Sequence, residues 1–276
     1  SPATSRRSNG PLEASRGSGL NAERYSVEFT PSGECFEVEA GETVLDAALR
    51  QGIQIRYGCR SGKCSTCKFQ VEDGEVDHGD VSVYSLPDAQ RDEGWALLCR
   101  AQPLTDLLIR DNRLPDTRAL PLLCPRAVEA EVVEARRLTP ELWELRLSLT
   151  EPLEFYAGQF AELGLQVGER TIWRSYSMAS PPSQDRELRF VIKGIDQGAF
   201  SGRLGALEAG ARLQLRGPFG GSYLRSGDRP VLLCAIGSGI APILAMLRAA
   251  AERGDPRAFH FFYGARRPEY LPYLEE

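Results

Sequence analysis

The chain has 276 residues, enough for two or three domains that each bury a core of their own. Hydrophobic residues make up 42% of it and charged residues 26%, which are values typical of a folded globular protein. The formal net charge of −5 argues against a general nucleic-acid partner.

Residues 1–24 contain mostly Ser, Arg, Gly, Pro and Asn with almost no periodic apolar residues, so we expect a disordered tail. From 25 to 111 the pattern becomes that of a compact domain. Apolar residues alternate on both sides of a Pro-Ser-Gly turn, which predicts a hairpin. A short amphipathic helix follows, with Thr43 as its N-cap and Gly52 at its end. A cysteine loop and further strands then complete a β-grasp domain.

Four cysteines of this domain are spaced as in plant-type ferredoxins, which hold a [2Fe–2S] cluster. Cys59, Cys64 and Cys67 follow the C-x4-C-x2-C spacing, and Cys99 comes after 31 further residues. Small residues around them allow backbone N–H groups to approach the sulfur atoms. The sequence therefore predicts these four thiolates as the metal ligands.

Other interpretations of the cysteines are weaker. A four-cysteine zinc site usually brings two C-x2-C pairs, whereas the chain has one. Disulfides would suit a short secreted chain, but no signal peptide leads the sequence and seven cysteines is an odd number. A Rieske centre needs two His, and His78 and His260 lie in unrelated segments. Cys35, Cys124 and Cys234 have no such partners, and we expect each to be a small buried apolar residue.

The first domain is acidic. Between residues 25 and 110 there are 15 Asp and Glu but only 8 Lys and Arg. Such a surface can dock electrostatically onto a basic patch of a partner, or it can simply keep the protein in solution. The composition favours neither explanation.

Residues 112–125 carry three prolines and little pattern, which predicts a linker between domains. Alternating segments separated by Gly and Pro turns then continue over 126–226, as in a small antiparallel β-barrel. The remaining part, 227–276, changes character. It contains a short buried strand, a glycine turn, a helix and a second strand, which together predict an α/β unit. The uncharged stretch 230–247 is interrupted by glycines and a proline, so we expect no membrane span.

Within the expected barrel, the run Arg174-Ser175-Tyr176-Ser177 resembles the Arg-x-Tyr-Ser flavin motif of the ferredoxin–NADP reductase superfamily. A tyrosine ring offers a plane for a flat flavin, and a nearby hydroxyl can reach the flavin N5. A guanidinium can hold the pyrophosphate with a fork of donors. The resemblance implies FAD as a cofactor, with Tyr176 and Ser177 as catalytic residues and Arg174 and Ser175 as further FAD contacts.

Neighbouring segments strengthen this resemblance. Residues 155–160 resemble the family's Pro-Gly-Gln-Phe turn, with Ala157 in place of proline, and residues 216–220 resemble its Gly-Pro-x-Gly closure. The other FAD contacts that the resemblance implies are Val191, Ile192, Lys193, Gly198, Phe200 and Ser201. The last three belong to a Gly-x-Phe-Ser segment, where a helix N-terminus and the serine cradle the flavin pyrophosphate.

A third motif, Gly237-Ser238-Gly239-Ile240-Ala241-Pro242, lies between a predicted strand and a predicted helix. Glycines at such a place let the backbone approach a pyrophosphate at the helix N-terminus. Alone, the run would more simply be a structural turn, but it follows a flavin domain and resembles the superfamily's nicotinamide-dinucleotide loop. The resemblance implies that Gly237, Ser238, Gly239, Ile240 and Pro242 contact the nucleotide.

The whole layout, over about residues 25–276, resembles the reductase components of bacterial multicomponent oxygenases. Segments 71–77 and 92–101 look most like reductases of soluble di-iron monooxygenases, and reductases of Rieske dioxygenases are nearly as close. The resemblance implies a cytoplasmic oxidoreductase that passes electrons from NADH through FAD and a [2Fe–2S] cluster to an oxygenase component.

Several alternatives stay open. A reductase of the same layout could serve a cytochrome P450 or a sugar dehydratase, and the chain could also be a non-enzymatic electron carrier or binding module. NADPH remains possible as the donor, because Arg266 and Arg267 follow the second strand of the last unit, close to Glu269. The family's later Cys-Gly-x-Pro segment has no counterpart, so we expect the nucleotide domain at 227–276 to be truncated.

Overall fold

The computed structural model describes residues 24–111 and 120–273. The expected tail, apart from Arg24, and residues 112–119 of the expected linker lie outside these ranges. Within the described part of the chain, no helix has the length and apolar character that a membrane crossing requires.

The N-terminal unit is a five-stranded mixed sheet with one helix, α1 (Val44–Arg50), packed on its core. In sheet order the strands are β2 (Glu34–Glu39), β1 (Arg24–Thr30), β7 (Leu107–Arg110), β3 (Lys68–Asp73) and β5 (Trp95–Leu97). Strands β1 and β7 pair in parallel, and the other pairs of this sheet are antiparallel. The smaller elements are β4 (Val76–Asp77), β6 (Gln102–Pro103) and helix α2 (Asp88–Asp92). This arrangement agrees with the expected β-grasp fold.

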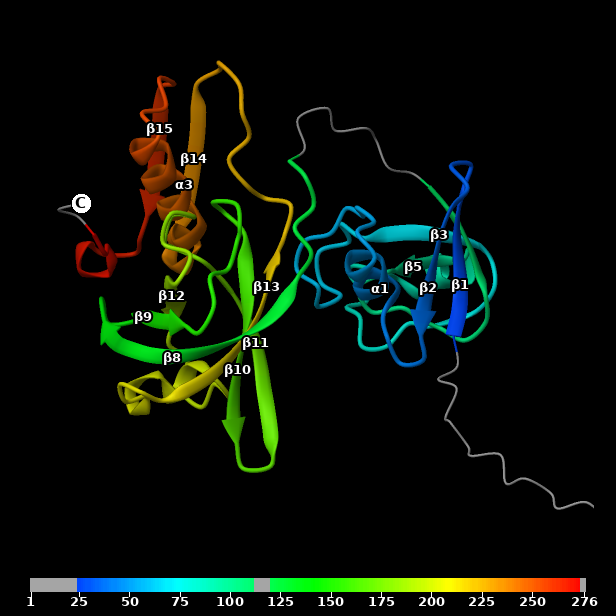
Figure 1. Cartoon of the computed structure of the whole chain (residues 1–276), viewed down its shortest axis with the longest axis horizontal. Helices are drawn as coiled ribbons and strands as arrows, with labels where there is room; N and C mark the ends of the chain where they lie inside the picture. The colour runs from blue at the N-terminus through cyan, green and yellow to red at the C-terminus, as the bar shows by residue number, and fades with distance from the viewer. Residues whose placement is uncertain (1–23, 112–119, 274–276) are drawn as a thin grey trace, which may run out of the picture.

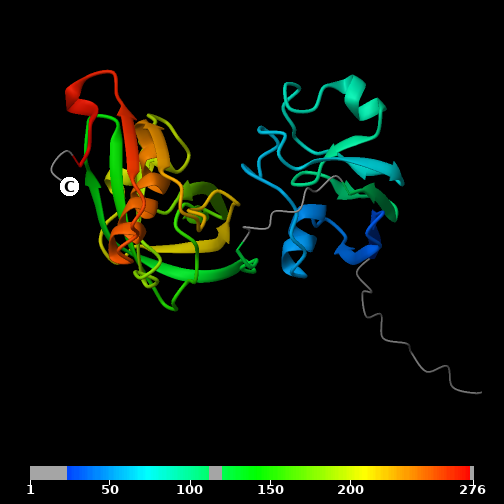
Figure 2. The same ribbon diagram turned by 90° about the horizontal axis from the view of Figure 1, so that it is seen from above.

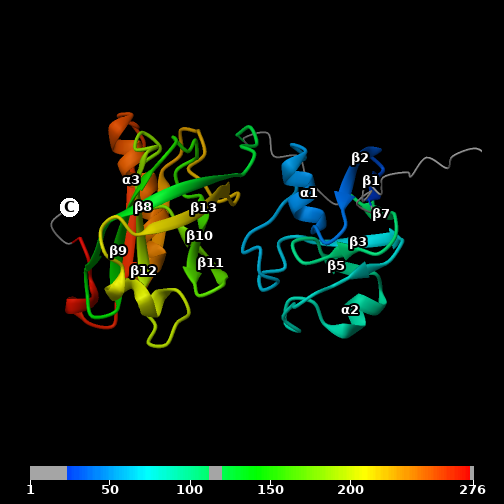
Figure 3. The same ribbon diagram turned by 60° about the horizontal axis from the view of Figure 1, so that its bottom comes forward.

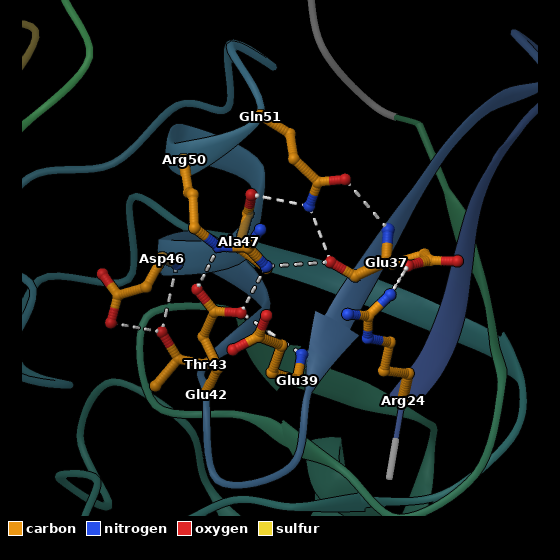
Figure 4. Close-up of polar contacts among 9 residues, drawn as sticks. All are labelled: Arg24, Glu37, Glu39, Glu42, Thr43, Asp46, Ala47, Arg50 and Gln51. Atoms are coloured by element: carbon orange, nitrogen blue, oxygen red, sulfur yellow. Dashed lines mark hydrogen bonds and ion pairs between the residues drawn. The ribbon is translucent and has the colours of Figure 1, made fainter. Parts of the chain in front are cut away.

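Helix α1 is fixed at both ends, as Figure 4 shows. Thr43 is its N-cap, because the Thr43 Oγ1 accepts a hydrogen bond from the Asp46 N–H at 3.2 Å, as the sequence predicts. At the other end, the Gln51 amide donates to the backbone oxygen of Glu37 on β2 at 2.6 Å. The anchored helix therefore gives the loop that follows it, and the carboxylate of Asp46, a defined position.

The second unit is a six-stranded antiparallel sheet that curls into a barrel. In sheet order its strands are β11 (Arg170–Ser177), β10 (Phe160–Val167), β13 (Arg212–Phe219), β8 (Arg126–Arg137), β9 (Leu142–Leu149) and β12 (Glu187–Lys193). A β-bridge between Met178 and Phe190 joins the two edges and closes the barrel. Alternate residues such as Leu145 and Leu147 fill its interior and are fully buried. The expected antiparallel barrel is confirmed.

The third unit is a strand–helix–strand arrangement in the predicted order. Its elements are β14 (Val231–Ile236), the 3₁₀ turn η2 (Gly237–Gly239), α3 (Ile240–Glu252), β15 (Phe259–Gly264) and the 3₁₀ turn η3 (Pro268–Tyr270). Strands β14 and β15 pair in parallel, as a helical crossover requires. Helix α3 buries Ile240 and Leu244 against the barrel, and Ala245 and Ala249 against β14.

The N-terminal unit lies to one side of the barrel, whereas α3 and its two strands pack directly on the barrel (Figures 1, 2 and 3). Contact between the first two units runs through the loop between α1 and β3. Phe219 of β13 and Phe160 of β10 pack against the N-terminal core. The Gly220 N–H donates to the Tyr57 hydroxyl oxygen at 2.8 Å. This loop also carries three of the four predicted metal ligands.

A buried carboxylate joins the barrel to the end of the third unit. Glu144 on β9 is only 3% exposed. Its Oε1 accepts from the Tyr273 hydroxyl at 2.6 Å, and its Oε2 accepts from Arg136 Nη2 at 2.9 Å. Burial alone would raise the pKa of Glu144, but these two hydrogen bonds outweigh burial and hold the pKa below its ordinary value.

We expect Glu144→Gln to lower the free energy of unfolding by about 1–3 kcal/mol at pH 7, because Tyr273 and Arg136 lose a charged partner. A depressed pKa stabilises the fold above the ordinary Glu range, so the difference from the wild type should shrink as the pH falls below 4.5. Urea unfolding at neutral and acid pH measures both effects. The control is Glu151→Gln. Glu151 is an exposed partner of Arg126, and its replacement should lower the free energy of unfolding by less than about 0.5 kcal/mol. Equal losses in the two variants would contradict this role of Glu144.

Candidate functional site

The structure brings the four predicted ligands together. Cys59 and Cys64 lie in the loop between α1 and β3, Cys67 directly precedes β3, and Cys99 closely follows β5. Hydrogen bonds pair Cys59 with Cys64 and Cys67 with Cys99. Electrostatic contacts also join the two pairs, between Cys59 and Cys99 and between Cys64 and Cys67.

Cys67 and Cys99 form the inner pair and are 2% and 5% exposed. Their mutual hydrogen bond raises the pKa of the Cys67 thiol and lowers the pKa of Cys99. Opposite shifts are expected when two neighbouring sulfurs share one proton. Metal binding replaces such a proton, since the ligand form of cysteine is the thiolate.

Backbone N–H groups surround the outer pair of sulfurs. The N–H groups of Ser61 and Lys63 each donate to Cys59 Sγ at 3.4 Å, and the Cys59 N–H donates to Cys64 Sγ at 3.4 Å. Partial burial raises the pKa of Cys59, but the hydrogen bonds from Ser61, Lys63 and Cys64 outweigh burial and lower the pKa to about 7. The loop therefore favours the thiolate.

Two glycines make this close approach possible. A Cβ on Gly58 would lie 3.1 Å from Cys64 Sγ. Gly62 has a φ of +70°, and a Cβ there would lie 3.0 Å from the backbone oxygen of Asp80. Any side chain at either position would therefore displace a ligand or the loop that packs on it.

The donor set suits a two-iron cluster better than a single ion. Among residues 24–111 and 120–273, no three His, Cys, Asp or Glu side chains converge on one metal-ion position. A zinc site would need four ligands around a single centre. Two adjoining pairs of cysteines instead fit a [2Fe–2S] cluster, in which each iron takes two of the four thiolates.

The other three cysteines differ from the expectation. Cys35, Cys124 and Cys234 are all exposed, so the prediction of small buried residues is wrong for each. Cys35 and Cys234 lie on β2 and β14, where the neighbouring residues Phe36 and Leu233 point inward. The two-residue period of a strand then turns both cysteines outward. Cys124 lies in the irregular segment before β8.

A cleft of about 1040 Å³ connects the cysteine loop to the barrel. On the side of the N-terminal unit it is lined mainly by Tyr57, Gly58, Cys59, Arg60, Ser61 and Lys63. On the barrel side it is lined mainly by Phe160, Glu162, Trp173, Arg174, Ser175 and Ser177. The structure thus places three of the predicted flavin contacts in one cleft with a predicted cluster ligand.

Residues of β11 divide between this cleft and the barrel core. Arg174, Ser175 and Ser177 line the cleft, whereas the ring of Tyr176 packs 5.3 Å from the ring of Phe200. Burial raises the pKa of Tyr176 to about 12, so its hydroxyl stays protonated. Arg174 is exposed and donates to the backbone oxygen of Trp173 at 2.7 Å. The hydroxyls and the guanidinium that line the cleft fit the chemistry of a flavin dinucleotide, whereas the Tyr176 ring lies against the barrel core.

The predicted residues of β12 do not line the cleft. Val191 is 3% exposed and Ile192 is fully buried, each within a hydrophobic core. Because both side chains are buried, only the backbone groups of Val191 and Ile192 are left to contact a ligand. Lys193 points elsewhere, and its Nζ lies 3.0 Å from Glu141 Oε2.

The predicted Gly-x-Phe-Ser segment leads into a 3₁₀ helix, η1 (Ser201–Ala206). A Cβ on Gly198 would lie 2.5 Å from Ser201 Oγ, so the turn requires glycine at this point. Phe200 is 1% exposed and fixes the turn to the barrel core, where it meets Tyr176. Gly198 and Ser201 therefore flank Phe200, whose ring contacts the ring of Tyr176.

The first turn of α3, which follows the glycine loop of the third unit, reaches the same cleft. Gly237 has a φ of +55°, and its backbone oxygen accepts a hydrogen bond from the Tyr263 hydroxyl at 2.9 Å. Ile240 is 2% exposed and roots the start of α3 in the barrel interface. Two residues later, Pro242 lines the cleft together with residues of β11. Ser238 and Gly239 lie between them in η2.

Sequence reasoning missed four of the residues that line the cleft: Tyr57, Arg60, Glu162 and Trp173. Arg60 carried a signal, because it and Lys63 are the two large charged residues between Cys59 and Cys64, where Ser61 and Gly62 are small. Trp173 directly precedes the flavin motif. Glu162 carried none, since it looks like any polar residue of an alternating strand.

Three family descriptions match consecutive parts of the chain. They are a 2Fe-2S iron–sulfur cluster binding domain at residues 27–104, an oxidoreductase FAD-binding domain at 129–223 and an oxidoreductase NAD-binding domain at 232–276. The cofactors that the sequence implies are confirmed by these matches.

Relatives with known roles match most of the chain. The reductase component of propane 2-monooxygenase from Mycolicibacterium goodii is 38% identical over 259 residues, which are 92% of this chain and 74% of that protein. The reductase component of phenol 2-monooxygenase from Pseudomonas sp. strain CF600 is 38% identical over 248 residues, 88% of this chain and 68% of that protein.

A solved structure agrees with both relatives. The Amycolatopsis cytochrome P450 reductase aligns with a TM-score of 0.79 and 32% identity, covering 91% of this chain and 75% of that one. The expected multidomain fold and the family resemblance are therefore confirmed. The chain belongs to the reductase components of multicomponent oxygenases, flavin and iron–sulfur oxidoreductases that carry electrons from a pyridine nucleotide through FAD and a [2Fe–2S] cluster to an oxygenase.

Proposed function

We propose that this protein takes electrons from NADH and delivers them to the hydroxylase of a soluble di-iron monooxygenase in the cytoplasm. The observation that carries the proposal is the shared cleft, in which Cys59 lies opposite Arg174 and Ser177. The two relatives that serve propane and phenol monooxygenases favour this class of acceptor. Thiolate ligands and free surface cysteines suit a reducing compartment.

The roles of individual residues follow from their positions. When bound, the flavin accepts an electron pair from the nucleotide and the cluster carries electrons onward singly. We assign Arg174 to the flavin pyrophosphate, because it is an exposed guanidinium at the edge of the cleft. Ser177 would hydrogen-bond the flavin ring, and Tyr176, held against Phe200, would flank it. The glycines of η2 would admit the nucleotide pyrophosphate.

A cytochrome P450 is the second candidate acceptor, since the P450 reductase structure aligns with the chain over 91% of its length. The two candidates are separated by measuring NADH-driven substrate oxidation with a purified di-iron hydroxylase and with a P450 component. Turnover with the hydroxylase alone supports the proposal. Turnover with the P450 alone would replace the hydroxylase by the P450 and leave the cofactor path unchanged.

We expect Cys64→Ser to abolish the cluster while NADH still reduces the flavin, because the barrel and the N-terminal unit have separate cores. Iron analysis and the visible spectrum measure the cluster, and anaerobic stopped-flow absorbance measures flavin reduction. The control is Cys35→Ser, an exposed cysteine on β2 that should keep both cofactors. Loss of FAD from the Cys64 variant would contradict the assignment of separate domains.

We expect Arg174→Ala to weaken FAD binding by about 1.5–3 kcal/mol, roughly tenfold to a hundredfold in Kd, because it removes a charge-assisted contact. Fluorescence titration of the apoprotein with FAD gives this Kd. Arg170 on the same strand is exposed and outside the cleft, so Arg170→Ala should bind FAD as the wild type does. An unchanged Kd in the Arg174 variant would remove this residue from the flavin site.

The choice of NADH rests on the partners of two arginines after β15. Arg266 forms an ion pair with Glu141, which also holds Lys193. Arg267 lies 3.7 Å from Glu269. Basic groups at this place would bind the 2′-phosphate of NADPH, but both already have a carboxylate partner. This arrangement favours a ribose without the phosphate.

We therefore expect a higher kcat/KM with NADH than with NADPH. Glu141→Gln should shift the ratio toward NADPH by up to about fivefold, because it releases an exposed Arg266 from its partner. The control Glu187→Gln removes an exposed carboxylate from β12 and should leave the ratio unchanged. A wild-type preference for NADPH would overturn the choice of nucleotide.

A further inference from the structure

Arg60 directly follows the ligand Cys59, and its side chain contacts residues of the barrel. Its guanidinium carbon lies 3.6 Å from the centre of the Phe219 ring. The side chain is only 12% exposed. Its backbone has a φ of +54°, a left-handed conformation that glycine or asparagine adopts more readily. Arg60 therefore adopts a backbone conformation that is unfavourable for its side-chain type.

Two carboxylates from different units meet the Arg60 guanidinium. Nη2 donates to Asp46 Oδ1 on α1 at 2.5 Å. Nη1 lies 3.1 Å from Glu162 Oε1 on β10 of the barrel. The second contact is an ion pair without the alignment of a hydrogen bond, since Nη1 has no hydrogen-bond acceptor. Glu162 is 19% exposed, so solvent and salt screen this attraction less than they would at an open surface.

The same interface has a second polar contact and an apolar centre. Tyr57 lies two residues before Cys59, and its hydroxyl oxygen accepts a hydrogen bond from the Gly220 N–H at 2.8 Å. Phe219 is 4% exposed and packs with the core of the N-terminal unit, and its ring lies 5.7 Å from the ring of Phe160. Arg60 covers this apolar centre and links charges on both sides of it.

The sulfur hydrogen bonds do not use the Arg60 side chain. The backbone N–H groups of Cys59, Ser61 and Lys63 donate to sulfur, whereas the Arg60 guanidinium meets Asp46 and Glu162. A change of the Arg60 side chain can therefore alter the contact between units while the ligand loop keeps its donors. Glu162 offers an independent test, because it lies on the barrel and outside the ligand loop.

We infer that Arg60 is a positioning residue. Its contacts with Glu162 and Phe219 hold the cluster-binding loop against the barrel, which we call the latch, and so fix the distance between the flavin and the cluster. The inference rests on the proposed transfer of electrons from the flavin to the cluster. It assigns to one side chain of the loop a role that the ligand cysteines could not perform, since their sulfurs would hold the iron.

The variants Arg60→Gln and Glu162→Gln test the latch in the holoprotein. In each variant, we expect a smaller fraction of molecules in which the N-terminal unit contacts the barrel. The rate at which the reduced flavin reduces the cluster should drop about tenfold or more. Flavin reduction by NADH, the iron content and the electron paramagnetic resonance signal of the reduced cluster should stay as in the wild type. Arg56→Gln, an exposed arginine before the loop, is the matched control.

A readout independent of electron transfer is the radius of gyration from small-angle X-ray scattering, which should increase in both single variants and not in Arg56→Gln. If Arg60→Gln loses its cluster, Glu162→Gln alone decides. A wild-type rate and radius of gyration in Glu162→Gln would overturn the latch. If the wild-type flavin fails to reduce the cluster at all, the proposed function fails, while the scattering comparison still tests the contact between the units.

Discussion

In the loop from Cys59 to Cys67, backbone N–H groups lie within hydrogen-bonding distance of sulfur while the chain turns tightly enough to gather three cysteines. Both conditions depend on residues without bulk, which explains the crowding around Gly58 and Gly62. The fourth ligand comes from elsewhere. The N–H groups of Val44 and Leu45 at the start of α1 donate to Ala101 O and Leu98 O at 3.0 Å each, on either side of Cys99. Donors that a helix leaves unpaired at its N-terminus thus hold the segment that brings the last sulfur.

Local chemistry in the sequence was sufficient to predict much of this. The Thr43 cap and the strand alternation of the barrel depend on neighbours only a few residues apart, and the structure agrees with them. The structure also brings the four cysteines together, as their spacing predicts. Contacts between units could not be predicted in the same way. Arg60, Glu162 and Phe219 lie far apart in the chain and meet only when two finished domains touch. The exposure of Cys35 shows a further limit, since residue type alone does not tell which face of a strand a side chain occupies.

The three units meet at one cleft, but the two contacts between them depend on different kinds of interaction. The third unit packs on the barrel through α3, with Ile240 and Leu244 in a shared apolar core. The N-terminal unit instead makes a small contact in which ionic and aromatic groups have a large part. Interfaces of the second kind are compatible with relative movement of domains. Such a contact suits a cluster-binding unit that accepts electrons at the barrel and donates them to another protein.

Arg60 places a positive charge beside a centre whose charge changes. Reduction adds one negative charge to the cluster, and a cation in the adjoining loop interacts more favourably with the reduced form. Thermodynamic linkage makes this effect reciprocal. If contact between the units changes the reduction potential of the cluster, then reduction of the cluster changes the equilibrium of that contact by the same free energy. Because Arg60 pairs with Asp46 and with Glu162 of the barrel, the oxidation state of a cluster held by the adjoining cysteines would be coupled to the domain arrangement. The potential measured for an isolated N-terminal unit would then differ from that of the cluster in the assembled reductase.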